Sequence, residues 1–416
     1  MKILFLSDSF PPDSLGGAEI ASFNLAKTLA NKGHDLLVVT TVQDKDKAGE
    51  EKYQGLKVFK IYVKEYHPIF TNYLSLWNPS AFRQVEKIVK EVGPDIIHAQ
   101  NIHHYLSYHC LKVARKYAKG VFLTAHDTML ISCGKFFDCI DEKNLSIPKQ
   151  FDYKVNLWKE WIRWGKSYNP FRNLVIRYYL KYVDKIFTIT DVVKDALYQN
   201  KITNVETVHY GTDMKLDVDD KNLDEFKSRL GIKDKKVILF GGRLSEHKGG
   251  RKTLEMLKYV IEKDPNTILL VVGVENDYAK YMERLAQAVG LEDAIIFTGW
   301  IDRSQMNFAY ASADVVITPS LYLDAFNLFN LEAMAVGKPV VGTCFGGTPE
   351  IIEDNKTGYV VNPYHTEMFG DRVLDILSNK DKARQFGETG KERVSKYFTL
   401  DMQAEKTLHW YKKFTN

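Results

Sequence analysis

The sequence predicts an α/β protein built from two doubly wound, Rossmann-like domains. Short apolar runs rich in β-branched residues alternate with longer stretches of helical periodicity, which is typical of parallel sheets covered by helices on both faces. This alternation breaks once, at residues 211–236, and then resumes. The 416 residues also exceed the roughly 250–300 at which a single hydrophobic core stops growing, so two domains are expected.

Seven strands are expected in the first half of the chain, with helices between several of them. The first strand, residues 3–7, precedes a helix over residues 18–32 that ends at Gly33, where a glycine cap belongs. Further helices are expected at residues 80–92 and 105–118. The other strands are expected at residues 36–41, 57–63, 95–99, 121–125, 185–190 and 206–209.

The break at residues 211–236 is dominated by Asp and Lys and carries only a short helical pattern. Five strands follow, at residues 237–240, 267–272, 294–298, 315–318 and 339–342. The last segment has the periodicity of a helix, which we expect to pack back on the first domain. The predicted domains are therefore residues 1–213 and 214–398, followed by a returning helix in residues 399–416.

The composition excludes several classes of protein. Lys and Arg number 57 against 53 Asp and Glu, and the net charge of +4 is too small to indicate a nucleic-acid partner. No apolar run approaches the roughly 18 residues of a membrane span, and the N-terminal apolar run is too short for a signal peptide. We therefore expect a cytoplasmic protein that binds no nucleic acid.

The spacing of cysteine and histidine does not favour a metal site. The residues between Cys133 and Cys139 fit neither a redox pair nor a zinc knuckle, so buried or incidental thiols are favoured over a disulfide. Four histidines lie between residues 98 and 109, but their spacing matches no common ligand pattern. We expect no metal and no cofactor.

Residues 323–335 follow the strand expected at residues 315–318 and form the strongest candidate site. Helical spacing begins near Leu328, so the backbone amides near Asn327 and Leu328 lie at a helix N-terminus, which attracts anions. Glu332 lies one turn further on, within reach of a sugar hydroxyl beside a diphosphate held at the helix end. The alternative is an ordinary helix with two incidental acids, Asp324 and Glu332.

A glycine-rich loop at residues 241–250 follows the strand expected at residues 237–240. Its glycines let a ligand approach the backbone, and Arg243 and Lys248 can neutralise a diphosphate from one side. A turn with solvated charges is the alternative. That alternative weakens because both loops follow strands of one domain, and ligands of doubly wound sheets bind beyond the carboxyl ends of the strands.

Two features of the first domain also offer contacts to a ligand. Gly16 and Gly17 open the helix after the first strand and could let a phosphate or sugar approach, although a tight turn explains them equally well. The loop lacks the GxGxxG pattern of dinucleotide-binding proteins. His126 stands at a strand end, where its imidazole could bond a sugar hydroxyl or simply be satisfied at a domain edge.

On these residues the chain resembles, over nearly its whole length, glycosyltransferase family 4, also called glycosyl transferases group 1. This large family of retaining glycosyltransferases of GT-B fold contains many bacterial lipopolysaccharide and exopolysaccharide sugar transferases. The matching motifs are Gly16–Gly17, His126, the junction-like stretch 208–213, the Arg243 and Lys248 pair, the acid–x7–acid element Asp324–Glu332, and the Gly-Gly-Thr-Pro-Glu loop at residues 346–350.

The resemblance implies a GT-B fold, with two Rossmann-like domains facing a central cleft, and a role for each matching residue. Arg243 and Lys248 bind the donor diphosphate, and Glu332 binds the ribose. Asp324 and the amides after it contact the donor sugar and phosphates. The implied substrate-binding residues are Gly16, Gly17, Arg243, Lys248, Phe326, Asn327 and Leu328, and the implied catalytic residues are His126, Asp324 and Glu332.

The implied activity moves a sugar from a UDP- or GDP-hexose, with UDP favoured, to a lipid-linked or polysaccharide glycan. The first domain binds the acceptor and the second binds the nucleotide sugar, which is a co-substrate and not a cofactor. The anomeric configuration is kept without a divalent metal. Two alternatives stay open: a nucleotide-sugar binding protein with impaired catalysis, and a nucleotide-sugar epimerase of the same fold.

The acid–x7–acid element departs from the family pattern at two positions. The family usually has Glu followed two residues later by Phe-Gly, whereas this chain has Asp324 and then Phe326 and Asn327. Asp is one methylene shorter than Glu, and Asn carries a side chain where Gly lets the backbone touch the ligand. The resemblance therefore leaves the transferred sugar open.

Residues 149–185 form a basic aromatic insert in the first domain. Cations among Trp and Tyr at helical spacing suit an interfacial helix on anionic lipid, which predicts peripheral attachment to the inner membrane face or a lipid-linked acceptor. One alternative has the aromatic side chains facing the core with the cations solvated. Single-stranded nucleic acid is the least favoured alternative, because no recognised binding module accompanies the insert.

Overall fold

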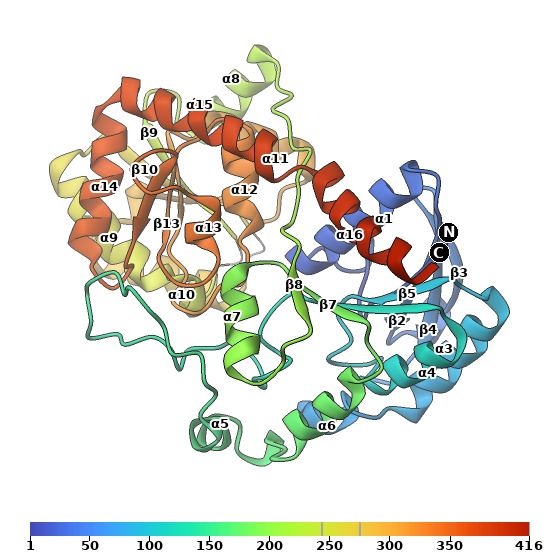
Figure 1. Ribbon diagram of the computed structural model, residues 1–416. Helices are drawn as coiled ribbons and strands as arrows, with labels where there is room; N and C mark the ends of the chain where they lie inside the picture. The colour runs from blue at the N-terminus through green and yellow to red at the C-terminus, as the bar shows by residue number, and fades with distance from the viewer. Residues whose placement is uncertain (243, 274–275, 416) are drawn as a thin grey trace. The chain divides into compact units, whose positions relative to one another are not determined.

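The computed structural model describes residues 1–242, 244–273 and 276–415, which form two compact units (Figure 1). Unit 1 comprises Met1–Asp138, Asp152–Gly211 and Leu400–Asn416. Unit 2 comprises Cys139–Phe151 and Thr212–Thr399. The chain changes unit between Gly211 and Thr212, close to the expected boundary at residue 213. Residues 139–151, which we expected in the first domain, belong instead to unit 2.

Unit 1 is built on an eight-stranded sheet in the order β3-β4-β2-β1-β5-β6-β7-β8. Its strands are β1 (Lys2–Leu6), β2 (Asp35–Val42), β3 (Gly49–Tyr53), β4 (Leu56–Tyr62), β5 (Ile96–Ala99), β6 (Gly120–Ala125), β7 (Lys185–Thr188) and β8 (Val205–Thr207). All neighbours pair in parallel except β3, which pairs antiparallel with β4. The edge strand β3 is not among the expected strands, because its sequence GEEKY contains no apolar run.

The main helices of unit 1 come from three parts of the chain. They are α1 (Gly17–Asn31), α2 (Thr71–Leu74), α3 (Pro79–Val92), α4 (His109–Tyr117), α5 (Leu157–Trp164), α6 (Arg172–Leu180), α7 (Asp191–Gln199) and α16 (Leu400–Thr415). Helix α4 begins four residues after the expected start at residue 105. The buried carboxylate of Asp8 accepts hydrogen bonds from the amides of His104, Tyr105 and Leu106, at 2.7–2.9 Å, and so holds these residues in a loop.

The last helix completes the core of unit 1. Leu408 and Tyr411 of α16 are buried among apolar side chains that include Phe5 and Phe122. The Tyr411 hydroxyl lies 2.5 Å from Nδ1 of the fully buried His98. Figure 1 shows α16 beside α1, where Lys32 pairs with Asp401 at 2.8 Å. The helix is therefore an integral part of unit 1.

Unit 2 contains a six-stranded, fully parallel sheet in the order β11-β10-β9-β12-β13-β14. Its strands are β9 (Lys236–Phe240), β10 (Thr267–Val271), β11 (Ile295–Phe297), β12 (Val315–Thr318), β13 (Val340–Thr343) and β14 (Gly358–Val361). The edge strand β14 is not among the expected strands, because it is only four residues long and begins with glycine. Two parallel-sheet units of this kind confirm the predicted fold class.

Five helices of unit 2 connect successive strands of its sheet: α9 (Gly250–Lys263), α10 (Asp277–Ala288), α11 (Arg303–Ser312), α12 (Leu328–Ala335) and α13 (Thr348–Ile351). Helix α8 (Asp220–Arg229) precedes β9, and α14 (Thr366–Ser378) and α15 (Lys380–Tyr397) follow β14. The core includes Phe240 of β9, Leu257 of α9 and Phe369 of α14. Among the helices that the structure describes, none has the combined length and apolar character needed to cross a membrane.

Residues 139–151 are attached to unit 2 at the carboxyl ends of β13 and β14. Asn362, just after β14, donates from Nδ2 to the carbonyl oxygens of Asn144 and Ser146 at 2.8 and 2.9 Å. The ring of Phe151 meets the edge of Phe345 at a centroid distance of 6.2 Å. These contacts explain why the segment belongs to unit 2, although it interrupts the sequence of unit 1.

Candidate active site

Two loops of unit 2 meet beyond the carboxyl ends of β9 and β12. A Cβ atom on Gly241 would lie 2.1 Å from Cδ1 of Phe329, so the loop after β9 packs directly on α12. Gly249 has φ +84°, and a Cβ atom there would lie 2.1 Å from the carbonyl oxygen of Pro319. Only glycine allows these approaches. They bring Lys248 next to the loop that leads into α12.

Lys248 and Asp324 form an ion pair at this meeting point. The Nζ of Lys248 lies 2.7 Å from Oδ2 of Asp324, and the two side chains are 17% and 8% exposed. Asp324 Oδ2 also accepts hydrogen bonds from Ser320 Oγ at 2.7 Å and from Asn327 Nδ2 at 3.3 Å. The structure therefore brings together two predicted site residues that come from different loops and lie far apart in the sequence.

Both partners of this pair are charged at neutral pH. Burial alone would raise the pKa of Asp324, but Lys248 and the hydrogen bonds hold that pKa below its ordinary value. Burial alone would lower the pKa of Lys248, but Asp324 and Tyr322 raise it. An ammonium group held this way can bind a diphosphate oxygen while it remains bonded to the carboxylate.

The N-terminus of α12 is partly closed by its own cap. Asn327 Oδ1 accepts a hydrogen bond from the amide of Phe329 at 3.1 Å, so this amide is not open to an anion. The amides of Asn327 and Leu328 donate no hydrogen bond to any residue that the structure describes. Of the amides at residues 327–329, only those of Asn327 and Leu328 therefore remain available for the anion site predicted at this helix end.

Aromatic side chains also support the other residues of the Asp324–Glu332 stretch. The hydroxyl of the buried Tyr310 donates to Oε2 of Glu332 at 2.9 Å, which fixes the direction of the carboxylate one turn into α12. Phe326 is 8% exposed and meets the ring edge of Phe398 at a centroid distance of 6.3 Å. Phe326 therefore supports the loop from its buried side. Arg243 lies outside the described residues.

The Gly346–Gly347 turn fixes the backbone of Asp324. Gly347 donates its amide to the carbonyl oxygen of Asp324 at 2.9 Å, and Gly346 pairs with Asp324 as an isolated β-bridge. Gly346 has φ +83°, and a Cβ atom there would lie 2.2 Å from the same carbonyl oxygen. The turn matched the family motif in the sequence, but this contact could not be read from it.

A cavity of about 100 Å³ lies beyond the ends of β9, β10 and β11. Its walls come from Leu244, Gly273, Phe297, Gly299 and three further residues of unit 2. Phe297 and Leu244 make part of the wall apolar, which suits a ligand with a flat aromatic ring. Apart from the glycines that follow the strands, no sequence pattern indicated this cavity.

In unit 1, His126 is enclosed. Its Nε2 lies 2.9 Å from Gln100 Oε1, and its Nδ1 is hydrogen-bonded to the hydroxyl of Tyr210. The residue is 7% exposed, and burial lowers its pKa to about 3, so the ring is neutral. Because both ring nitrogens are occupied, the imidazole does not offer the sugar contact that the sequence suggested.

The start of α1 is also occupied by a side chain of the protein. A Cβ atom on Gly16 would lie 2.3 Å from Oε2 of Glu19, and Glu19 Oε1 accepts a hydrogen bond from Ser9 Oγ at 2.7 Å. The carboxylate thus covers the first turn beside Gly16 and Gly17, where it satisfies the helix dipole. An anionic ligand at this position would have to displace Glu19.

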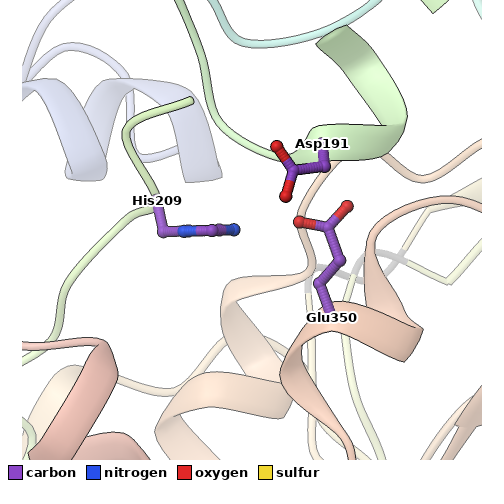
Figure 2. A group of neighbouring side chains, drawn as sticks. All are labelled: Asp191, His209 and Glu350. Atoms are coloured by element: carbon purple, nitrogen blue, oxygen red, sulfur yellow. The ribbon is translucent and has the colours of Figure 1, made fainter. Parts of the chain in front are cut away.

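Figure 2 shows three further ionisable side chains, two from unit 1 and one from unit 2. Asp191 begins α7 and accepts a hydrogen bond from Thr207 Oγ1 at 2.6 Å, while His209 follows β8. Glu350 lies in α13 of unit 2, where its carbonyl oxygen accepts from Arg393. None of these residues was assigned a role from the sequence.

The chain matches two family models in succession. Residues 15–216 match Glycosyltransferase Family 4, and residues 222–393 match Glycosyl transferases group 1. A relative in Methanocaldococcus jannaschii, an uncharacterised glycosyltransferase, is 25% identical over 418 residues, which cover 99% of this chain and 98% of that protein.

Two further comparisons are with proteins whose names mention a nucleotide or a nucleotide sugar. A GDP-mannose-dependent phosphatidylinositol monomannoside mannosyltransferase of Mycobacterium tuberculosis is 28% identical over 188 residues, or 44% of this chain and 49% of that protein. The structure of Anabaena HepE in complex with UDP and glucose superposes with a TM-score of 0.72 at 18% identity, and covers 99% of both chains. The latter likeness shows a shared fold.

The paired family models, the full-length relative and the two Rossmann-like units agree on one assignment. Enzymes of this family use a nucleotide sugar, retain the anomeric configuration and need no metal ion. The chain belongs to the retaining glycosyltransferases of family 4 and has their GT-B fold.

Proposed function

We propose that the protein transfers a hexose from a UDP-sugar, or less favourably a GDP-sugar, to a lipid-linked or polysaccharide glycan of the lipopolysaccharide type. Unit 2 binds the donor and unit 1 binds the acceptor. The observation that carries the donor site is the ion pair between Lys248 and Asp324 beside the open amides of α12. It places a cation, two amide donors and a carboxylate within one loop cluster.

The donor is bound by groups with complementary chemistry. Lys248, together with Arg243, neutralises the diphosphate, and the amides of Asn327 and Leu328 donate to its oxygens. Glu332 accepts from the ribose hydroxyls, and the cavity bounded by Leu244 takes the base. Asp324 accepts from a hydroxyl of the transferred sugar.

The reaction is promoted by stabilising the negative charge that develops on the leaving diphosphate. The bond between the anomeric carbon and the phosphate oxygen breaks, and a bond to the acceptor oxygen forms on the same face of the sugar. The acceptor proton passes to the leaving diphosphate. Lys248 and the helix amides stabilise that diphosphate, so catalysis arises from positioning and electrostatics.

The choice of nucleotide rests on the relatives. HepE was crystallised with UDP and glucose, whereas the mycobacterial relative is named for GDP-mannose. HepE resembles the chain over its full length, and the mycobacterial protein matches less than half of it. The UDP-sugar is therefore favoured, and a test must include both nucleotides.

An exposed apolar surface on unit 1 supports a membrane-bound acceptor. We call this surface the α5 face, and it consists of Leu157, Trp158, Trp161 and Ile162 on α5, Phe171, Leu174 and Tyr178 on or beside α6, and Phe70, Tyr73 and Trp77 near α2. Trp158 and Trp161 are 64% and 50% exposed. Asn72 and Tyr73 donate to the carbonyls of Ser167 and Tyr168, which joins the α2 region to the insert.

Helix α5 is inverted relative to an ordinary surface helix, in the sense that it buries a charged residue and exposes apolar ones. Its one buried residue is Glu160, which accepts from the amide of Cys133 at 2.8 Å and from Arg163 at 3.0 Å. Its side chains Leu157, Trp158, Trp161 and Ile162 are exposed, as are the nearby Lys154, Lys159 and Lys166, whereas Trp164 packs against Gly134. Apolar side chains among exposed cations fit an anionic lipid surface. We propose that this face attaches the protein to the inner face of the cell membrane.

Not every residue of the basic aromatic insert takes part in this face. Arg172 is 1% exposed and donates to the carbonyls of Met129 and Ser132, and Tyr179 is buried as well. Tyr179 follows the alternative in which the aromatic side chains of the insert face the core, whereas Arg172 is a buried cation, which neither interpretation of the insert expected. The aromatic side chains of Trp158, Trp161, Phe171 and Tyr178 are exposed and do not face the core.

The donor site is tested by binding and turnover. UDP-glucose, UDP-galactose, UDP-N-acetylglucosamine and GDP-mannose are screened by thermal shift, because a ligand that binds only the folded state raises Tm. Lys248→Ala and Glu332→Ala should abolish turnover of the donor, while Lys258→Ala, on the exposed side of α9, should match the wild type. Full activity in either site variant would contradict the assignment.

A further inference from the structure

Asp127, the residue after His126, is the accessible polar group at the carboxyl end of β6. Its side chain is 41% exposed, whereas His126 is enclosed with both ring nitrogens bonded. We propose that Asp127 is the residue of unit 1 that binds a hydroxyl group of the acceptor glycan, with His103 positioning it. This inference rests on the proposed function, because it names the contact by which the acceptor is recognised.

Asp127 is held in place before any ligand arrives. Its Oδ1 accepts from the amide of Met129 at 2.7 Å. The carbonyl of Met129 in turn accepts from Arg172 at 2.6 Å, and the carbonyl of Ile131 accepts from Asn173 at 2.6 Å. Because these hydrogen bonds from α6 hold the loop after β6 in one conformation, the loop loses little conformational freedom when a ligand binds.

His103 lies behind Asp127 and is 2% exposed. Its Nδ1 is 2.6 Å from the hydroxyl of Tyr108, and its Nε2 is 3.7 Å from Oδ1 of Asp127. Burial holds the pKa of His103 well below its ordinary value, so the ring is neutral. In the tautomer in which the Tyr108 hydroxyl donates to Nδ1, the ring proton is on Nε2 and faces the carboxylate.

The carboxylate keeps most of its hydrogen-bonding capacity for a ligand. The distance of 3.7 Å from His103 is too long for a hydrogen bond, and Nε2 has no partner among the residues that the structure describes. Asp127 Oδ2 accepts no hydrogen bond from any described residue either. A carboxylate accepts several hydrogen bonds and donates none, so its ligand must be a donor such as a sugar hydroxyl. A phosphate or other anion would be repelled.

The test compares Asp127→Asn with a control that has the same local geometry. Asp152→Asn changes an exposed residue of unit 1 whose Oδ1 accepts from the amide two residues later, at 3.0 Å, as Asp127 does. Two reactions are measured with the fastest of the four screened donors. One is release of the nucleoside diphosphate in water, and the other is transfer of labelled sugar to a chloroform–methanol lipid extract of the source cells.

We expect Asp127→Asn to raise the half-saturating extract concentration by about tenfold, because one charge-assisted hydrogen bond is lost. Donor KM and release of the nucleoside diphosphate in water should match the wild type, as should both reactions of Asp152→Asn. His103→Gln should raise the half-saturating extract concentration less, again with donor KM unchanged, as a positioning role requires.

Three results would overturn the inference. Transfer by Asp127→Asn that saturates at the wild-type extract concentration would remove Asp127 from the acceptor site. An equal loss of diphosphate release and transfer would show a general defect and not a contact with the acceptor. A wild-type protein that releases no nucleoside diphosphate from any of the four donors would instead overturn the proposed function, and the inference with it.

Discussion

At the scale of single residues, the ion pair of Asp324 makes stability depend on pH. Its ordinary pKa of 3.8 is lowered in the folded protein, where Lys248 and its hydrogen bonds outweigh burial. As the pH falls, the unfolded chain takes up this proton first. The contribution is therefore complete above about pH 4–5 and is lost as the pH falls through the lower folded value.

Asp324→Asn should lower the free energy of unfolding by about 3 kcal/mol at pH 7, because Lys248 loses its partner in a buried setting. The gap between variant and wild type should begin to narrow below about pH 4, where the unfolded wild-type chain takes up the proton of Asp324, and should close only below the lower folded pKa. Urea unfolding between pH 3 and pH 7 measures both effects. A gap that stays constant over this range would contradict the assignment of the shift to this carboxylate.

His126 makes stability depend on pH in the same direction as Asp324, but here burial is the main cause of the lowered pKa. Burial lowers its pKa from 6.5 to about 3, so between these values only the unfolded chain binds the proton. Stability should therefore fall with falling pH over this window, by at most about 1.4 kcal/mol per pH unit for this one residue. His126→Gln, measured by urea unfolding at pH 5 and pH 7, should be less sensitive to pH by about 2 kcal/mol. An unchanged sensitivity would show that the ring is not held neutral.

The sequence indicated which residues are candidates for the site, but not which side chains they contact. The spacing from Asp324 to Glu332 and the lysine five residues after Arg243 were visible in the sequence, and the structure joins Lys248 to Asp324. The enclosure of His126 was not visible, because Gln100 and Tyr210 come from distant parts of the chain. The exposure of the Asp127 side chain is likewise a property of the folded chain that no local sequence pattern indicates.

At the scale of elements, the inverted helix α5 predicts membrane binding that depends on its tryptophans. The double variant Trp158→Ser and Trp161→Ser should bind vesicles of phosphatidylglycerol at least about tenfold more weakly, because two indole rings leave the interface. Trp300→Ser is the control, since Trp300 is 62% exposed in unit 2. Co-sedimentation measures the binding. Equal pelleting of the wild type with neutral and anionic vesicles, or none with either, would remove the membrane assignment.

Elements with a strong apolar signal were predicted well, and the exceptions have physical causes. The strands expected at residues 36–41 and 57–63 correspond to β2 and β4, which are eight and seven residues long and mostly apolar. Strand β3 is a polar edge strand, and β14 has only four residues. At the start of α12 the sequence indicated a helix end, but it did not show that Asn327 caps the helix with its own side chain.

At the scale of the whole molecule, the last helix is required for the first unit. A chain that ends at Thr399 would leave an apolar opening where Leu408 and Tyr411 now pack, and His98 would lose its partner. We expect unit 1 of this truncated protein to lose its cooperative unfolding and to be cleaved rapidly in limited proteolysis, while unit 2 stays protected. Tyr411→Phe is the milder comparison and should cost about 1 kcal/mol, since it removes only a hydrogen bond. A protease-resistant unit 1 in the truncated protein would contradict this role of α16.

The change of unit between Gly211 and Thr212 coincides with the change of composition that begins at residue 211, but no such signal marks residues 139–151, which belong to unit 2. Their attachment depends on two hydrogen bonds from Asn362, more than two hundred residues away in the sequence. No local pattern carries that information. Tertiary contacts of this range decide unit membership without a trace in the neighbouring sequence.

The interleaving of the two units also sets the order in which they can form during synthesis. When residues 139–151 leave the ribosome, β13 and β14, to which they attach, have not yet been made. Unit 1 in turn lacks α16 until residues 400–415 have been released, after all of unit 2 has been translated. Unit 1, although its synthesis begins first, is therefore completed after unit 2 has been made. The incomplete unit 1 must thus remain protected from aggregation until α16 has left the ribosome.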